Sequence, residues 1–217
     1  MMFKIKKYKV TFLIDTSNNW IEKYLKKKNF GLKKEFKFKF ESNYKKIKNQ
    51  DIVFILGYTK ILKNNFLKKN KYNLVVHESN LPKGKGFAPV QWQILNKKKK
   101  IPVCLISAVE KVDSGDIFER TYFKLTGDEL YDEIREKQAD ITFKIIERFL
   151  KKFPHVYSTK QFGKGSFYKR RFPKDNELDI NKSIKEQFNL LRLGDNDNFP
   201  SFFYYKKKKY ILKIFKE

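Results

Sequence analysis

The sequence is poor in cysteine, and this scarcity excludes a class of protein. A single cysteine, Cys104, cannot form a disulfide within the chain, so the sequence does not indicate a disulfide-stabilised secreted fold. No apolar run approaches the roughly 20 residues of a membrane-spanning helix. The basic start of the chain also lacks the apolar region and cleavage site of a secretory signal. We therefore expect a soluble, cytoplasmic protein with no membrane contact.

Several cofactor motifs are also missing. No glycine-rich dinucleotide fingerprint follows the first expected strand, and the sequence holds no phosphate-binding P-loop. An HExxH motif and paired CxxC motifs are absent, so we expect no metal site. The chemistry of the protein must therefore be sought in other residues.

Negative charge is scarce, because 50 Lys and Arg residues accompany 24 Asp and Glu residues, a formal net charge of +26. A nucleic-acid-binding protein is the first interpretation of such an excess. The excess is nearly all lysine, however, spread over the chain together with abundant Asn, Ile, Phe and Tyr, which is typical of AT-rich coding. Arginine, which reads bases and phosphates better, is scarce. We therefore expect no nucleic-acid partner, although the charge favours an anionic substrate.

Strand and helix patterns alternate over roughly residues 1–154. Apolar, β-branched and aromatic runs predict strands at 8–15, 35–40, 51–56, 72–77, 101–109 and 117–125. Helical spacing appears between them around Trp20–Leu25 and over 88–95. It appears again over 126–153, where Thr126 and Glu129 stand at capping-box spacing. This alternation predicts an α/β fold with a mostly parallel, Rossmann-like sheet and helices on both faces.

The character of the chain changes after Pro154. Residues 155–182 are polar with few periodic signals, and an amphipathic helix is predicted at about 183–192. Two aromatic strands then flank a lysine-rich turn. We expect a catalytic domain over 1–154 and a small C-terminal extension with a β-hairpin over 155–217, which packs on the sheet or completes a pocket.

His77, one of two histidines, ends a predicted strand. Ligands of open α/β sheets bind at the carboxyl ends of strands. Gly57 and Tyr58 follow a second strand and the loop 110–116 follows a third, so we expect these loops to converge. Asp113 then approaches His77, and a carboxylate beside an imidazole orients it and stabilises its cationic form. Taken alone, each residue is better explained as a strand end or a turn cap.

The spacing around these residues resembles the signature of the folate-dependent formyltransferase family. The family motif is His-x-Ser-x-Leu-Pro, then Gly and Pro, and later Asp-x-Gly-x-Ile. Its matches here are His77, Ser79, Leu81, Pro82, Gly86, Pro89, Asp113, Gly115 and Ile117. The segment ILGYTKIL at 55–62 resembles the family's folate loop, and the resemblance covers most of residues 1–150. Segments of the extension, such as SFYKRRFPKDNELD, resemble nucleotide-sugar N-formyltransferases of the branch associated with 4-amino sugars of the pseudaminic-acid type.

The resemblance implies transfer of a formyl group from N10-formyltetrahydrofolate to the amine of a nucleotide-linked amino-dideoxy sugar, in surface-glycan biosynthesis. It implies that His77 moves protons or stabilises the oxyanion, and that Asp113 orients His77. The implied folate contacts are Thr59, Leu62, Val109, Glu110, Val112 and Asp113. The implied nucleotide-sugar contacts are Ser79, Lys83, Gly84, Phe167, Tyr168, Arg170 and Arg171. The family also favours homodimers, and an aromatic tail suits an interface.

One position departs from the family pattern. The family carries an asparagine two residues before the histidine, as an amide donor to the formyl oxygen, and this sequence has Val75 there. Asn73 lies on the same strand face but about 6–7 Å further down the strand, too far to replace the donor. We expect a substitute such as Asn80 or a backbone N–H. The alternatives are a cationic His77 that acts without this donor, or an impaired enzyme.

Other interpretations remain open. Glycinamide ribonucleotide and methionyl-tRNA formyltransferases share the core motif. The first should keep the asparagine that is Val75 here, and the second is expected to carry a larger C-terminal barrel. A basic nucleic-acid-binding protein on this scaffold, with catalysis impaired by Val75, is the alternative from another functional class.

Overall fold

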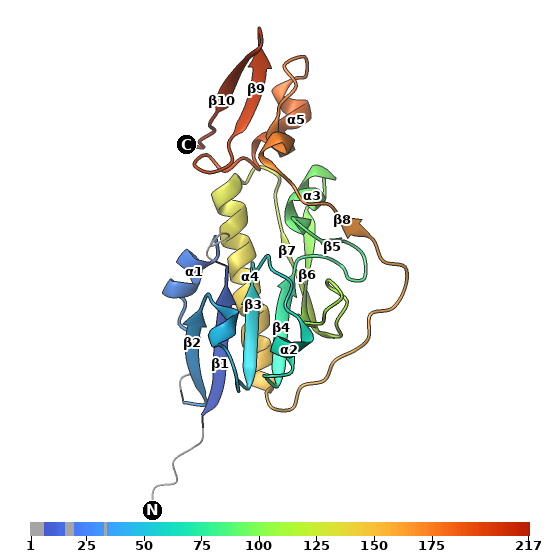
Figure 1. Ribbon diagram of the computed structural model, residues 1–217. Coiled ribbons are helices and arrows are strands. Elements are labelled where there is room, and N and C mark those ends of the chain that lie inside the picture. Colours follow the sequence, from blue (N-terminus) through green and yellow to red (C-terminus); the bar gives the residue numbers. More distant parts are fainter. Residues whose placement is uncertain (1–6, 16–19, 33) are drawn as a thin grey trace, which may run out of the picture.

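A six-stranded sheet runs through the computed structural model, which describes residues 7–15, 20–32 and 34–217 (Figure 1). Its strands, in spatial order, are β2 (Phe36–Glu41), β1 (Tyr8–Ile14), β3 (Ile52–Leu56), β4 (Tyr72–His77), β6 (Lys100–Ser107) and β7 (Ile117–Lys124). The first four are parallel to one another, whereas β6 is antiparallel to β4 and to β7. The predicted α/β fold with a mostly parallel sheet is confirmed.

The direction of β6 differs from our expectation. We expected β6 to be parallel to β3 and β4, so that the loop 110–116 would follow it at their carboxyl edge. Instead β6 pairs antiparallel with β4, with His77 opposite Cys104, so this loop leaves from the other end of β4. The seven-residue helix α3 (Pro89–Leu95) spans only about 10 Å, whereas the six residues of β4 span about 20 Å. The helix is too short to carry the chain back along β4, so β6 starts near the end of β4.

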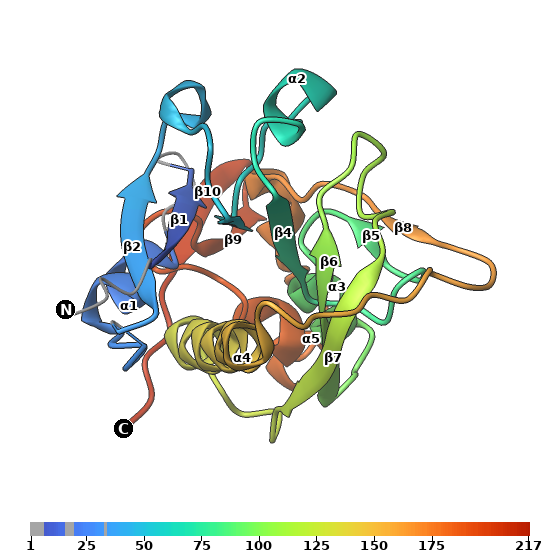
Figure 2. The same ribbon diagram turned by 90° about the horizontal axis from the view of Figure 1, so that it is seen from below.

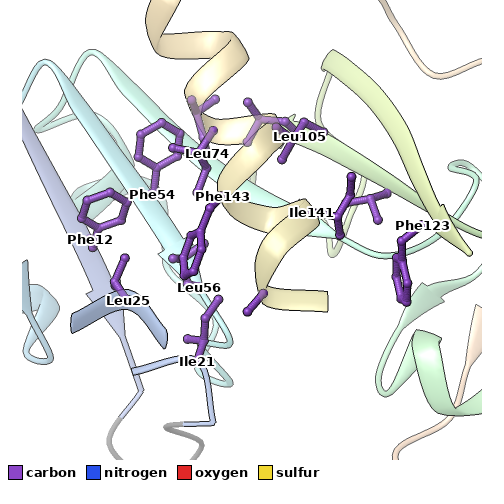
Figure 3. Close-up of a cluster of buried hydrophobic side chains, with 14 of the residues drawn as sticks. Phe12, Ile21, Leu25, Phe54, Leu56, Leu74, Leu105, Phe123, Ile141 and Phe143 are labelled. Carbon is purple, nitrogen blue, oxygen red and sulfur yellow. The ribbon is translucent and has the colours of Figure 1, made fainter. Parts of the chain in front are cut away.

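Helices cover both faces of the sheet (Figure 2). The longest, α4 (Tyr131–Lys152), packs on one face together with α1 (Glu22–Lys27) and α3. Phe12 and Phe54 point into this layer (Figure 3), where Phe54 packs edge-on against Phe149 of α4. On the opposite face, α2 (Asn64–Leu67) covers a smaller apolar cluster. No helix among the described residues is both long and apolar enough to cross a membrane.

The C-terminal extension passes around the β7 edge of the sheet and returns toward its carboxyl end (Figure 1). Two-residue strands β8 (Phe167–Tyr168) and β5 (Lys85–Gly86) pair in parallel. The remaining elements are the 3-10 helices η1 (Tyr44–Lys46) and η2 (Pro173–Asn176), helix α5 (Ile184–Leu191), and strands β9 (Ser201–Tyr205) and β10 (Lys208–Leu212). The predicted terminal β-hairpin is confirmed. The β5–β8 pair was not predicted, because two residues carry no periodic signal.

The long helix begins five residues later than the pattern predicted. Its N-cap is Leu130, whose backbone N–H donates to the Glu133 carboxylate over 2.8 Å. The expected partners do meet, since Glu129 accepts from the backbone N–H groups of Thr126 and Gly127 at 2.8 and 3.0 Å. Their hydrogen bonds close a turn ahead of the helix and do not form its cap.

Glu129 also ties the extension to the rest of the molecule. The side chains of Glu129 and Arg192 are only 4% and 3% exposed. Arg192 donates to the Glu129 carbonyl over 3.0 Å and lies 3.6 Å from its carboxylate, and Lys137 donates to that carboxylate over 2.6 Å. Burial by itself would raise the pKa of Glu129, but the bonds from Lys137, Thr126 and Gly127 outweigh it and lower the pKa to about 2. The carboxylate therefore stays charged beside Arg192.

We expect Glu129→Gln to lower the free energy of unfolding by about 3 kcal/mol, because Arg192 is left buried without its counter-charge. The folded pKa of Glu129 lies below its ordinary value of 4.5, so the stabilisation is complete above pH 4.5 and is lost as the pH falls toward 2. Urea denaturation should therefore show a smaller difference between variant and wild type at pH 3 than at pH 7. Glu136→Gln, an exposed change on the same helix, is the control, and equal losses in both variants would contradict the assignment.

Candidate active site

A cavity of about 670 Å³ lies at the carboxyl ends of β3 and β4. One wall is the loop after β3, residues 57–62, and another is the loop 108–113 after β6. Val75 and His77 of β4 lie between them. Further lining comes from residues 86–91, from the first turns of α4 and from residues 170–173 and Phe199 of the extension. The cavity is thus built from segments far apart in the sequence, at the edge where open α/β sheets bind ligands.

His77 and Asp113 meet inside this cavity. Their side chains are 7% and 13% exposed, and His77 Nδ1 lies 3.5 Å from Asp113 Oδ2. The other ring nitrogen, Nε2, lies 2.8 Å from the carbonyl oxygen of Gly84. A carbonyl oxygen can only accept, so Nε2 carries a proton in this arrangement. Because Nδ1 faces the Asp113 carboxylate, the two neighbours together fix the orientation of the ring.

The loop after β6 folds back over the sheet to bring Asp113 to His77. Asp113 has a left-handed backbone with φ of 46°, and its Oδ2 accepts from the Gly86 N–H over 2.8 Å. A Cβ on Gly115 would stand 1.8 Å from the carbonyl oxygen of Ser107, so only glycine fits there. The expected approach of Asp113 therefore depends on a tight turn against the end of β6.

The six residues predicted to contact folate all line the cavity: Thr59, Leu62, Val109, Glu110, Val112 and Asp113. Thr59 donates to Asp15 Oδ2 through its backbone N–H at 3.0 Å and its hydroxyl at 2.5 Å. Glu110 accepts from the Asn64 N–H over 2.8 Å, which links the β6 loop to α2. Val109 and Val112 are 44% and 39% exposed, although both are apolar. Two fixed loops with exposed valines suit a flat ring whose polar edge is bound by backbone groups.

Guanidinium groups form the opposite wall. Arg170 and Arg171, both predicted, line the cavity, and so does Arg135 of α4, which was not predicted. Nη1 of Arg171 and Nε of Arg135 are buried and have no hydrogen-bond partner among the described residues. Burial also lowers the pKa of the Arg171 guanidinium, which Asp175 opposes. Three guanidinium groups that line one cavity favour an anionic ligand.

Two aromatic rings and one hydrogen bond fix the Arg135 side chain, and a sequence pattern reveals these contacts only in part. Its guanidinium lies 4.7 Å from the ring centre of Trp20 and 5.0 Å from that of Tyr131. Its Nη1 donates to the side-chain oxygen of Gln138 over 2.9 Å. The available signal was Gln138 itself, a polar residue on the apolar face of a long helix.

The other predicted substrate residues do not line this cavity: Ser79, Lys83, Gly84, Phe167 and Tyr168. Ser79 is buried, and Lys83 lines a second cavity of about 380 Å³. Phe167 is 66% exposed, and Tyr168 stacks parallel to Trp92 at 6.4 Å between ring centres. Gly84 acts at a distance, because its carbonyl holds His77. The segment that carries Phe167 and Tyr168 therefore supports a loop beside the cavity, and neither of these two rings lines the cavity.

Neither Asn73 nor Asn80 takes the place that Val75 leaves. Asn73 donates to the carbonyl of Leu67 over 2.8 Å, away from the cavity. Asn80, which we expected as a substitute, accepts from Arg120 over 3.0 Å and lines the second cavity. Of the substitutes that we expected, a backbone N–H remains as the donor, since both ring nitrogens of His77 face other acceptors. The described residues contain no group of three or more His, Cys, Asp or Glu side chains that could hold a metal ion.

Known proteins resemble the chain in sequence and in structure. The family model for formyl transferases matches residues 7–150. A methionyl-tRNA formyltransferase from Sulfurihydrogenibium sp. (strain YO3AOP1) is 29% identical over 149 residues, which are 66% of this chain and 48% of the relative. The chain thus spans about half the length of that relative.

Solved structures share the fold. The methionyl-tRNA formyltransferase from Clostridium thermocellum has a TM-score of 0.78 at 22% identity, over 93% of this chain and 90% of that one. A sugar N-formyltransferase from Shewanella sp. has a TM-score of 0.67 at 14% identity, over 97% and 98%. HypX from Aquifex aeolicus, solved with tetrahydrofolic acid, has a TM-score of 0.70 at 15% identity, over 95% and 37%. Since the matched family region covers most of the chain and includes His77 and Asp113, the chain belongs to the formyl transferase family.

Proposed function

We propose that the protein transfers a formyl group from N10-formyltetrahydrofolate to the amine of a nucleotide-linked amino sugar. The observation that carries the proposal is one cavity that joins three parts. These are the His77–Asp113 pair, the loops predicted for folate, and a wall of guanidinium groups. The tetrahydrofolic acid bound to HypX, a protein of the same fold, supports folate as the formyl carrier.

The proposed transfer joins the acceptor nitrogen to the formyl carbon, breaks the bond from that carbon to the folate nitrogen, and moves one proton between the two nitrogens. Charge develops on the formyl oxygen and needs a donor. With Val75 at the usual amide position, we assign this donor to a backbone N–H. His77, oriented by Asp113 and the Gly84 carbonyl, moves the proton between the two nitrogens. The low polarity around the buried pair strengthens the interaction between the donor and the developing charge.

The acceptor follows from the cationic wall. Planar guanidinium groups match the oxygens of a diphosphate, and Arg135, Arg170 and Arg171 all line the cavity. Phe172 and Phe199 line the same cavity and are each 52% exposed, so they offer ring faces to a nucleoside base. Phe172 and Phe199 replace Phe167 and Tyr168, which we had expected as aromatic contacts to the nucleotide sugar. A diphosphate between a base and an amino sugar fits this arrangement.

Methionyl-tRNA is the second candidate acceptor, because the sequence relative reported above is a methionyl-tRNA formyltransferase. The deciding experiment incubates the protein with N10-formyltetrahydrofolate and, in parallel, nucleotide-linked amino sugars, methionyl-tRNA and glycinamide ribonucleotide, with products read by mass. We expect a formylated amino sugar. Formylation of methionyl-tRNA alone would overturn the acceptor assignment. No product at all, together with salt-sensitive nucleic-acid binding, would favour an impaired enzyme that binds nucleic acid.

We also propose that the protein forms a homodimer. The hairpin β9–β10 stands apart from the central sheet (Figure 1). It exposes three large aromatic side chains: Tyr204, Tyr205 and Tyr210. Exposed aromatic residues of this kind are enriched where proteins associate, which supports the dimer expected from the sequence.

We expect His77→Asn and Asp113→Asn each to lower kcat for formyl transfer by about 10²–10⁴-fold. Both changes preserve side-chain size closely enough for the fold to persist, which circular dichroism checks. The matched control is His155→Asn, an exposed change at the other histidine, which should leave the rate unchanged. Rates near that of the wild type in both site variants would remove the pair from the catalytic assignment.

We expect Arg135→Gln to raise the KM for the nucleotide sugar by about tenfold, because one charge-assisted hydrogen bond to the diphosphate is lost. The KM for the folate donor and kcat should change little, as expected for a contact made equally in ground and transition states. Arg148→Gln, on the exposed face of the same helix, is the control. An equal rise in the KM for folate would place Arg135 in the wrong subsite.

We expect Val75→Asn to fold normally, because this side chain lines the cavity, where water can solvate an amide. The new amide restores a donor beside His77, so kcat should rise by about tenfold. Thermal unfolding and steady-state rates test both parts. A fall in kcat with an unchanged melting temperature would mean that another group already occupies the donor position.

A further inference from the structure

The strap formed by residues 155–172 contacts both loops that position the catalytic pair. It begins after α4, beyond the region matched by the family model, and crosses the start of β7. There Thr159 and Ile117 exchange two backbone hydrogen bonds of 2.9 and 2.8 Å. Ile117 lies four residues after Asp113, so the strap is anchored at the base of the loop that carries the catalytic carboxylate.

Gln161 reaches from the strap into that loop. Its side-chain nitrogen donates to the carbonyl oxygens of Asp113 and Gly115, both over 2.8 Å. Its side-chain oxygen is buried and has no hydrogen-bond partner among the described residues. A buried acceptor without a partner is unfavourable, so the two donated bonds fix this amide in its place. They join the two carbonyls on either side of Ser114 and hold the turn closed.

Ser166 acts on the second loop. Its hydroxyl accepts from the Gly84 N–H over 2.9 Å, and its carbonyl accepts from the Lys85 N–H over 2.9 Å. The Gly84 carbonyl, on the same residue, is the acceptor for His77 Nε2. The loop and the strap also approach each other closely at Gly86, where an added Cβ would stand 2.5 Å from the Tyr168 carbonyl oxygen. The backbone of the strap therefore lies directly against the loop that orients the imidazole.

We propose that Gln161 is a positioning residue, and that the strap sets the separation of His77 and Asp113. Five links close a ring. His77 contacts Gly84, Gly84 contacts Ser166, and the backbone of the strap joins Ser166 to Gln161. Gln161 in turn contacts Asp113, and Asp113 contacts His77. The inference rests on the proposed function for its catalytic consequence. Its structural part concerns only the position of the two loops and is tested separately.

Gln161→Ala and Gln161→Glu test the proposal. The first removes both donors, and the second sets a carboxylate against two carbonyl oxygens. The matched control is Gln187→Ala, because Gln187 also donates to two backbone carbonyls, those of Asp179 and Lys182, elsewhere in the extension. We expect kcat to fall by about tenfold or more in both Gln161 variants, since small displacements of catalytic groups are costly. The KM for the acceptor and the melting temperature should match those of Gln187→Ala.

Hydrogen exchange supplies the readout that does not depend on turnover. The Gly86 N–H donates to Asp113 Oδ2, so its exchange should become several-fold faster in Gln161→Ala than in Gln187→Ala. Exchange in β3 and α4 should not change. Equal kcat and equal exchange in the two variants would overturn the proposal. If the wild type formylates no acceptor, the proposed function fails, whereas faster Gly86 exchange in Gln161→Ala alone still supports the strap's positioning role.

Discussion

The contact between His77 and Asp113 depends on backbone groups more than on side chains. The Gly84 carbonyl fixes one ring nitrogen, the Gly86 N–H fixes the carboxylate, and the turn at Gly115 allows no Cβ. Two of these glycines have positive φ, which other residues rarely adopt. The chemistry therefore constrains a few glycines strictly and leaves the rest of a lysine-rich surface free to vary.

Much of the fold could be predicted because most of its elements show a local periodicity of apolar residues. The strands, the long helix and the terminal hairpin all carry an apolar spacing that a single sequence reveals. The direction of β6 could not be predicted, because it depends on how far α3 carries the chain. The motif predicted the approach of Asp113 to His77 that the structure shows, whereas the contacts of Arg135 and Gln161 were missed. Their roles arise from contacts between segments that no local pattern connects.

The distribution of arginine is informative in a chain that uses lysine almost everywhere. Arg135, Arg170 and Arg171 line the cavity, and Arg192 is buried against Glu129. A guanidinium offers a planar fork of donors that an ammonium lacks. The presence of arginine at these places indicates that the geometry of the N–H donors matters there and that charge alone does not suffice. The scarcity of arginine is thus a better guide to the site than the net charge.

The strap also has a consequence for the order in which the molecule becomes active during synthesis. Its bonds to the catalytic loops connect residues 46 to 82 positions apart, so they close long chain loops. The sheet and the long helix precede the strap in the chain and can form first on the ribosome. A nascent chain that ends before the strap lacks the bonds that align the loops of His77 and Asp113. Their alignment then becomes possible only once residues 155–172 have left the ribosome.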